Sequence, residues 1–270
     1  MGKWAAMLVV YNEEEYIEYA ISSVIDRMDH VLVLRGLKPW HGSELELDRT
    51  SDRVRALDAS KVTLVEGVWR SEADQRNQAL SLAEELGCEF GLVIDADEVY
   101  GPQDLDSMIE VVEANPHVDG WCTSWWTYWK SPLWRIVPPE PFRPIVVLRL
   151  DPSIRFDTQR QPTVRVVGDL SSPQPFLHHF SYAKPAHRIT DKIRTFEHAD
   201  EILEGWWEDK WLAWDTDHAL VNLHPTVPQC YRRAQYFGPD GLPEIMRTHP
   251  YVTDGVNGLT VQFVPPNRSD

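Results

Sequence analysis

The 270-residue sequence has only three cysteines, and they stand far apart. Cys88, Cys122 and Cys230 form no Cys-x-x-Cys pair, so the chain encodes neither a disulfide framework nor a zinc knuckle. This usage of cysteine fits a reducing compartment best. We therefore expect a cytoplasmic protein.

Long apolar runs are missing as well. The longest one near the N-terminus, from Trp4 to Tyr11, is too short to span a bilayer, and nothing after it resembles a signal cleavage site. No internal repeat and no low-complexity stretch is present. We expect no membrane span.

Positive charge is scarce. The chain has 26 Lys and Arg against 42 Asp and Glu, which gives a formal net charge of −16 at pH 7. Such a surface repels polyanions over a Debye length, so a broad nucleic-acid surface or a face for anionic membranes is disfavoured, whereas a local basic pocket is not. With 43% hydrophobic and 11% aromatic residues, the chain can form one large or two small domains with a real core.

Four short apolar runs alternate with amphipathic segments. Their composition indicates strands buried on both faces, at Trp4 to Val10, Val31 to Leu34, Val62 to Val65 and Phe90 to Ile94. Helices are predicted between and after them, from near Glu13, from about Ser71 to Leu86, and from Pro102. Ser71 and Asp74 have the spacing of a capping box. This order predicts an α/β fold with a doubly wound, mostly parallel sheet, whose ligands lie beyond the carboxyl ends of its strands.

Three carboxylates in four residues, Asp95-Ala96-Asp97-Glu98, directly follow the fourth run. Because side chains alternate along an extended segment, Asp95 and Asp97 point the same way where the strand ends. Mg²⁺ and Mn²⁺ prefer a few carboxylate oxygens and complete their coordination with water or phosphate oxygens. The motif predicts metal-held phosphate chemistry, although a solvated acidic loop after a strand has the same spacing.

Three blocks together resemble the family 2 glycosyltransferases of the GT-A fold. They are Tyr11-Asn12-Glu13-Glu14 after the first strand, Gln75 to Leu80 in a helix, and Val93 to Glu98. Their order and approximate spacing match that family over roughly residues 5 to 200. The resemblance implies a GT-A (Rossmann-like) fold and transfer of a sugar from a UDP- or GDP-sugar to a hydroxyl of a carbohydrate or glycoside. It also implies a Mn²⁺ or Mg²⁺ cofactor.

The resemblance also implies roles for particular residues. Tyr11, Asn12 and Glu13 would contact the nucleotide, and Arg76 would lie near its ribose or diphosphate. Asp97, together with Asp95, would hold the metal that bridges the diphosphate and so serve catalysis. Trp69, just after the third apolar run, is counted with the donor-binding residues. The alternatives are an ordinary helix N-terminus at residues 11–13 and a solvated helix charge at Arg76.

A later segment, from His178 to Ile193, is similar to a His-x-Ser-Tyr segment and the Lys-Ile helix that follows it in many relatives. A histidine from this segment often completes the metal site, and imidazole is a reasonable ligand for Mn²⁺. His179 is the first choice and His178 the reserve, since adjacent strand residues point to opposite faces. Lys192 would reach the diphosphate as a point charge. The alternatives are a hydrogen-bonded core histidine and a solvated lysine.

The sequence departs from the family in two places. The second strand usually ends in an acid that takes the nucleotide, but Leu34 here runs into Arg35, and similar acid spacing returns only at Asp48. An inserted loop, in which Trp40 and Lys38 could contact donor or acceptor, explains this best. Base specificity is therefore open.

The second departure concerns the catalytic base. Many relatives place a His-Glu pair after an Arg-Phe strand, and here Arg155-Phe156 is followed by Asp157 without that pair. Asp157 is the candidate base, with Asp119 and Glu98 behind it. The stereochemical outcome, retaining or inverting, does not follow.

Tryptophans gather in two places. The first group, from Trp121 to Trp129, could form an acceptor wall because flat rings suit the apolar faces of sugars, but most of its members are expected in the core. The second group, from Trp206 to Trp214, indicates a helix packed against the main domain.

We expect a catalytic domain over residues 1–224, with a nucleotide-sugar-binding half (1–100) and an acceptor-side half (101–224). Residues 225–270, rich in proline, should form an extension packed on it, with a loose end after Pro265.

Two other functions fit parts of the pattern. The stretch from Asp95 to Val99 also matches the nucleophile loop of haloacid-dehalogenase-like phosphatases, but that loop normally follows the first strand, and three strands precede it here. A non-catalytic sugar-binding or degenerate transferase domain built on the tryptophans would need no paired aspartates.

Overall fold

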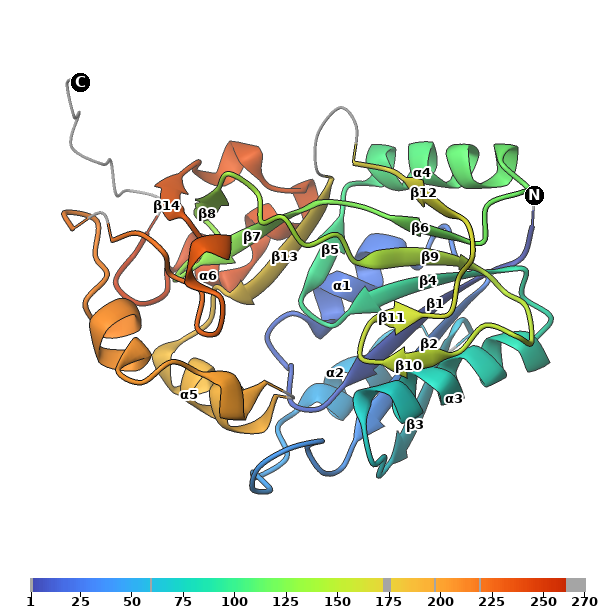
Figure 1. The fold of residues 1–270 in the computed structure, drawn as a ribbon, viewed down its shortest axis with the longest axis horizontal. Coiled ribbons are helices and arrows are strands. Elements are labelled where there is room, and N and C mark those ends of the chain that lie inside the picture. Colours follow the sequence, from blue (N-terminus) through green and yellow to red (C-terminus); the bar gives the residue numbers. More distant parts are fainter. Residues whose placement is uncertain (1, 59, 172–175, 197, 219, 261–270) are drawn as a thin grey trace.

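The computed structural model describes residues 2–58, 60–171, 176–196, 198–218 and 220–260. Within them, a seven-stranded sheet organises the N-terminal half (Figure 1). Its strands, in spatial order, are β12 (Val167–Asp169), β6 (Gly120–Cys122), β9 (Ile145–Arg149), β4 (Phe90–Asp95), β1 (Trp4–Val10), β2 (His30–Gly36) and β3 (Val62–Gly67). Strands β4, β1, β2 and β3 are parallel, and β9 runs antiparallel between β4 and β6.

Helices cover both faces of this sheet because β1 is apolar at every position. Its even-numbered residues, such as Ala6 and Leu8, pack in one core with α1 (Ile17–Val24) and α4 (Pro102–Ala114). Its odd-numbered residues, such as Met7, pack in another core with α3 (Glu72–Glu85). The short helix α2 (Thr50–Arg55) lies beside α1. The predicted α/β fold with a mostly parallel sheet and flanking helices is confirmed.

Two predicted elements differ in detail. Helix α1 begins at Ile17, one turn later than Glu13, while α3 begins as predicted, with Ser71 Oγ accepting a hydrogen bond of 3.1 Å from the Asp74 amide. The prediction that the third strand is buried on both faces is wrong. Strand β3 is the edge of the sheet, and its side chains are half-buried or exposed because no strand lies beyond it.

A second sheet of five strands stands beside the first (Figure 1). Its order is β14 (Arg233–Tyr236), β8 (Trp134–Val137), β7 (Trp125–Trp129), β13 (Leu177–Tyr182) and β5 (Glu98–Tyr100). Only Ala96 and Asp97 separate β4 from β5, so the chain passes directly from one sheet to the other at the acidic motif. A two-stranded ribbon, β10 (Phe156–Thr158) and β11 (Gln161–Pro162), lies near α3.

An aromatic core supports the second sheet. Trp129 meets Trp206 and Trp211 edge to face. The π-helical turn η2 (Trp207–Leu212) carries two tryptophans of the second group, Trp207 and Trp211, and Trp206, Trp211 and Trp214 are buried in this core, as predicted. Residues after 225 add Tyr231 and Met246 to this core. The remaining helical segments are α5 (Ala186–Thr195), η1 (Ala199–Glu201), η3 (Pro228–Cys230), η4 (Pro239–Gly241), η5 (Glu244–Thr248) and α6 (Pro250–Thr253).

The loose end expected after Pro265 falls outside the described residues. Within the described part of the chain, no helix combines the length and the apolar character that a membrane crossing requires.

Candidate active site

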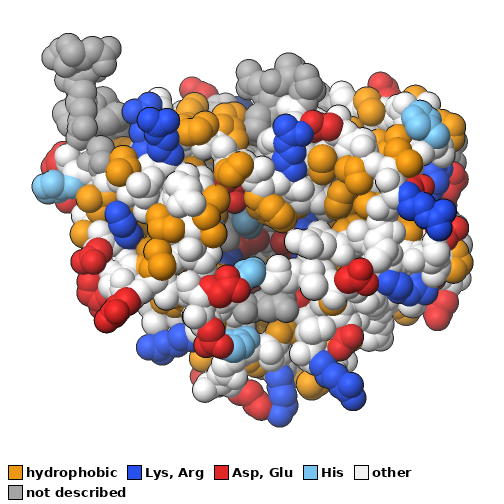
Figure 2. Space-filling model, in the orientation of Figure 1, with side chains coloured by type: hydrophobic (Ala, Val, Ile, Leu, Met, Phe, Trp, Pro, Cys, Tyr) orange, Lys and Arg blue, Asp and Glu red, His pale blue; other side chains and the backbone are white. Residues whose placement is uncertain are grey.

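A cavity of about 600 Å³ opens beyond the carboxyl ends of β1 and β4. Figure 2 shows this face of the molecule hollowed near its middle, with acidic side chains visible in the opening. Residues 9–13 and 95–97 line it from the first sheet, and β13, α5 and the turn between β10 and β11 line it from the other sides. The cavity thus lies where a doubly wound sheet normally binds its ligand.

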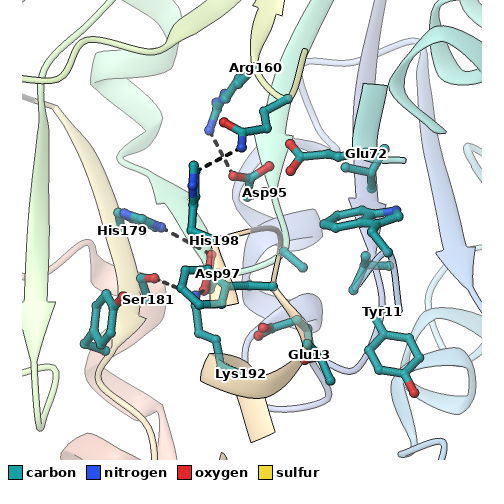
Figure 3. A pocket seen from close by; sticks show the side chains of 18 of the residues that line it. Tyr11, Glu13, Glu72, Asp95, Asp97, Arg160, His179, Ser181, Lys192 and His198 are labelled. Carbon is teal, nitrogen blue, oxygen red and sulfur yellow. Dashed lines mark hydrogen bonds and ion pairs between the residues drawn. The ribbon is translucent and has the colours of Figure 1, made fainter. Parts of the chain in front are cut away.

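Asp97 stands at the centre of this cavity and is 5% exposed (Figure 3). Its backbone oxygen accepts a hydrogen bond of 2.8 Å from the Phe180 amide, which fixes the motif against β13. The Nζ atoms of Lys184 and Lys192 lie 3.0 and 3.5 Å from Asp97 Oδ2. Burial alone would raise the pKa of Asp97, but these two lysines hold it well below its usual range. Asp97 is therefore a buried carboxylate that is ionised at neutral pH.

Asp95 is held from the other side by two guanidinium groups. Arg76 Nη2 lies 2.7 Å from Asp95 Oδ1, and Arg160 Nη1 lies 3.1 Å from Oδ2. Burial opposes ionisation, but the two arginines lower the pKa of Asp95 to about 2. Glu98 is fully buried and also binds Arg160, while burial raises its pKa to about 7.

The two histidines of β13 point in different directions, as predicted. His178 Nδ1 is 2.7 Å from the Tyr128 hydroxyl, away from the cavity, whereas His179 lines the cavity with Nε2 3.6 Å from Asp97 Oδ1. That distance is too long for a hydrogen bond. Burial lowers the pKa of His179 to about 4, so its ring is neutral, and its buried Nδ1 has no partner among the described residues.

The fit of a divalent cation can be judged from these atoms. A neutral imidazole nitrogen that faces an ionised carboxylate oxygen across a gap is a suitable donor pair for Mn²⁺ or Mg²⁺. Asp97 and His179 fit in this way, but both oxygens of Asp95 already accept from arginines. No group of three His, Cys, Asp or Glu side chains within the described ranges is arranged to hold a metal. A cation here would need oxygens from its substrate, as Mg²⁺ usually does.

Tyr11, Asn12 and Glu13 all line the cavity, but their side chains also hold other parts of the chain. The Tyr11 hydroxyl is 3.1 Å from the Leu45 carbonyl oxygen, and Asn12 Nδ2 donates to the Glu46 carbonyl at 2.9 Å. Glu13 forms an ion pair with Lys184, and burial raises its pKa to about 7. Their contact with a nucleotide stays a prediction.

The loop after β2 brings Asp48 back to the end of that strand, while its origin as an insertion stays a prediction. Asp48 pairs with Arg35 at 3.2 Å and with Arg188 at 2.8 Å, so the late acid returns to the end of β2 and is neutralised there. Trp40 lines the cavity and donates to Gln75 Oε1 at 2.7 Å, while Lys38 is exposed beside Glu44.

Two predicted site residues lie outside the cavity lining. Trp69 follows the edge strand β3, and its Nε1 donates to Gln78 Oε1 at 2.6 Å. Asp157 is exposed on β10. A third candidate, Asp119, is not part of the lining either. Its Oδ2 accepts hydrogen bonds from the backbone amides of Arg165 and Val166. Of the first tryptophan group, Trp125 lines the cavity and packs against His179.

Several charged residues of the cavity were not singled out from the sequence, among them Arg160, Lys184 and Glu140. Lys184 belongs to the segment from His178 to Ile193 that resembles the family, two residues after Tyr182. Its position in that segment could have indicated a role in the site. Arg160 and Glu140 come from irregular segments, and no periodicity marks them.

Comparisons with known proteins concern the fold. No protein-family model matches the chain, and no curated protein does. Among solved structures, the chain has matches to GT-A glycosyltransferases. S. aureus TarS 1–349 in complex with UDP matches at 14% identity over 77% of this chain and 75% of that chain, with a TM-score of 0.47.

Two further solved structures match over a shorter part. Glucosyl-3-phosphoglycerate synthase from Mycobacterium tuberculosis, in complex with Mn²⁺, UDP and phosphoglyceric acid, matches at 19% identity over 46% of this chain, with a TM-score of 0.36. Mannosyltransferase PcManGT from Pyrobaculum calidifontis, in complex with GDP-Man and Mn²⁺, matches at 22% identity over 48% of this chain, also with a TM-score of 0.36. The matched parts are 43% of the synthase and 36% of the mannosyltransferase. The chain is similar to these glycosyltransferases in its α/β fold.

Proposed function

We propose that this protein is a metal-dependent glycosyltransferase that moves a sugar from a UDP- or GDP-sugar to a hydroxyl of a carbohydrate or glycoside. The observation that carries the proposal is Asp97, an ionised carboxylate buried at the end of β4 and facing His179 in the cavity. The sequence blocks that resemble family 2 glycosyltransferases support it independently.

The cavity has the charges that a nucleoside diphosphate requires. In a chain of net charge −16, four buried or half-buried cations converge on the acidic motif: Arg76, Arg160, Lys184 and Lys192. Lys192 is the most accessible of them, at 20% side-chain exposure, and it also donates to Ser181 Oγ at 2.6 Å. Lys192 is therefore placed to meet a phosphate oxygen as a point charge.

Asp97 and His179 would hold the metal ion, and Asp95 would contribute through its charge. When bound, Mn²⁺ or Mg²⁺ supplies Lewis-acid stabilisation of negative charge on the departing diphosphate. The chain's own lysines and arginines act on the same charge, because they lie in a buried site where fixed cations act more strongly than in water. The anomeric C–O bond then breaks through an oxocarbenium-like state with its electron pair leaving on the diphosphate.

Thermal unfolding with a panel of ligands tests this function. The ligands are UDP, GDP, UDP-glucose, UDP-N-acetylglucosamine and GDP-mannose, each with Mn²⁺, Mg²⁺ or EDTA. A ligand at 100 times its dissociation constant adds about 2.7 kcal/mol of stability, which raises the Tm of a chain of this size by about 5 °C or more. We expect this shift with one nucleotide and a divalent cation, and its loss in EDTA and in Asp97→Ala.

Asp191→Asn is the matched control, since Asp191 is a cavity carboxylate on α5 with no cation within 4 Å among the described residues. It should keep the full shift. No stabilisation by any nucleotide would overturn the proposal. Stabilisation by free sugars alone would favour a sugar-binding module instead, and hydrolysis of simple phosphate esters that depends on Asp95 would favour a phosphatase.

A further inference from the structure

Glu140 is a buried carboxylate that no sequence motif marks. It lies in residues 138–144, the segment that follows β8, and it lines the cavity while being only 7% exposed. Its Oε1 accepts a hydrogen bond from Thr127 Oγ1 on β7. Thr127 lies beside His179 in the register of the two parallel strands, so Glu140 is held one strand away from that histidine.

Among the described residues Glu140 has no cationic partner, unlike three other carboxylates of the cavity. Glu13 binds Lys184, Asp95 binds two arginines, and Asp97 binds two lysines. Within the described part of the chain, no Lys, Arg or His nitrogen lies within 4 Å of Glu140. Glu140 is therefore a buried cavity carboxylate that keeps its basicity.

The groups that face Glu140 are aromatic or weakly polar. Trp125, Cys230 and Tyr231 line the cavity together with Glu140, and burial, followed by the charge of Glu140, raises the pKa of the Cys230 thiol. Tyr182 and Tyr231 line the same cavity as Glu140 and Asp97, and burial, followed by the charge of Glu140, raises the pKa of both hydroxyls. Burial raises the pKa of Glu140 to about 7, despite the hydrogen bond from Thr127. A carboxylate in this environment can accept a proton near neutral pH.

We propose that Glu140 is the general base of the reaction and that Trp125, Tyr182 and Tyr231 form the surface on which the acceptor lies. This inference rests on the proposed glycosyltransferase function. The acceptor hydroxyl oxygen forms a bond to the anomeric carbon while its proton passes to a Glu140 carboxylate oxygen. The anomeric carbon–oxygen bond to the diphosphate breaks, and the diphosphate leaves with the electron pair. Flat rings and a single basic oxygen suit a sugar hydroxyl.

Water serves as the acceptor in the test, because the natural one is not needed. Hydrolysis is measured for whichever of UDP-glucose, UDP-N-acetylglucosamine and GDP-mannose stabilises the wild type, with Mn²⁺ present, between pH 5.5 and 8.5. The variants are Glu140→Gln, which keeps the shape and the bond from Thr127, and Glu140→Asp, with Asp191→Asn as the control. We expect Glu140→Gln to bind the donor as tightly as the wild type but to hydrolyse it about 10²–10⁴-fold more slowly.

Two readouts separate a base from a merely structural residue. The wild-type rate should rise with pH up to about 7 and then level, and Glu140→Gln should lose this rise. Glu13 also titrates near pH 7 in the cavity, so the comparison between the proteins assigns the rise to one group. Sodium azide needs no base, so it should restore turnover in Glu140→Gln by forming the glycosyl azide, with the nitrogen–carbon bond replacing the bond to the diphosphate.

Equal rates and equal pH profiles in wild type and Glu140→Gln would overturn this assignment while the proposed function stood. A wild type that binds a donor but never hydrolyses it would overturn it as well, because a base in this position activates water. If no nucleotide-sugar binds, the proposed function itself fails. If Glu140→Gln does not fold, as judged by its melting curve, Glu140→Asp carries the same comparison, with a reduced rate expected and a pH rise that is retained.

Discussion

Lys184 is the residue on which the charges of the cavity depend. It is 2% exposed and pairs with two carboxylates at once, the buried Asp97 and the half-buried Glu13, which follow the ends of two different strands. Its own pKa is raised above the ordinary lysine range, since these carboxylates outweigh the effect of burial. One lysine side chain from the segment after β13 thus links the loop after β1 to the acidic motif after β4.

Replacing Lys184 by methionine should destabilise the protein in a pH-dependent way. Removing one partner of a buried ion pair costs about 3–5 kcal/mol because the other charge is left unpaired. The pKa of Glu13 is raised to about 7, so this carboxyl favours folding below its unfolded pKa of about 4.5 and loses that contribution as the pH rises through 7. Lys184 lowers the pKa of Glu13, so removing this lysine raises that pKa further and makes ionised Glu13 more costly in the folded protein. Urea unfolding should therefore show a larger destabilisation at pH 8 than at pH 5.5.

Lys192→Met is the matched comparison for this measurement. Among the described residues Lys192 forms an ion pair with one carboxylate, Asp97 at 3.5 Å, and it is partly exposed, so its loss should cost less free energy of unfolding. A Lys184→Met destabilisation that is small, or the same at both pH values, would contradict the role given to this lysine.

The residues predicted from the sequence are those that adjoin regular elements. Asp95, Asp97 and His179 could be placed because they end or lie on strands with clear apolar patterns. Arg160 could not, since it reaches Glu98 across 62 residues of sequence from a tight turn between two very short strands. Glu140 could not be predicted for the same reason, because it lies in an irregular segment whose contacts produce no periodic pattern in the sequence.

At the scale of elements, the way in which a strand or helix is buried determines whether it can be predicted from its apolar residues. Strands β1, β2 and β4 could be located because they are continuous apolar runs, and helices α3 and α4 because each buries one face at helical spacing. The second sheet could not be derived from the sequence. Its strands β5 and β8 have three and four residues, and its pairings join β13 to both β7 and β5 over long separations. Such non-local pairings carry no local signal.

Helix α3 offers a test of an element that the sequence did predict. Ser71 caps its N-terminus, and Ser71→Ala should lower the free energy of unfolding by about 1 kcal/mol because the Asp74 amide loses its acceptor. Ser71→Asp should retain most of that stability. The midpoint of urea unfolding measures both changes. Stabilisation by a nucleotide should be unchanged in either variant, since Arg76 lies in the body of the helix. Equal midpoints for Ser71→Ala and the wild type would show that the cap contributes nothing.

At the scale of the whole molecule, a chain of strongly negative net charge contains a cavity in which lysines and arginines stand among carboxylates. The net charge of −16 repels a nucleotide at long range, while Lys184, Lys192 and the arginines attract it only after it has entered. Raising the ionic strength from about 10 mM to 150 mM shortens the Debye length from about 30 Å to about 8 Å. The distant repulsion is screened more than the buried attraction.

The association rate of a fluorescent nucleotide should therefore rise with added NaCl. Stopped-flow mixing of mant-labelled UDP or GDP, at constant Mn²⁺, measures the rate, and potassium chloride gives the same result if screening is the cause. A rate that falls with salt would mean that the cavity cations, and not the surface, control the approach.

The expected division of the chain at residue 224 stays a proposal, but the packing gives it physical content. Tyr231, Leu242, Met246 and Val252 share one aromatic core with Trp129 and Trp206. The proline-rich part up to residue 260 therefore completes the second core as well as covering it. Its many prolines obscured this in the sequence, since an irregular chain buries side chains without any period.

The two-residue connection between β4 and β5 has a mechanical consequence. The first sheet passes into the second at this connection, and its second residue, Asp97, accepts a hydrogen bond from the Phe180 amide of β13. Because side chains alternate along a strand, one added or deleted residue in this connection would turn every side chain of β5 to its opposite face. The fully buried Glu98 and Tyr100 would then exchange places with Val99. The two-residue length of this connection therefore determines which side chains of β5 face each side of the second sheet.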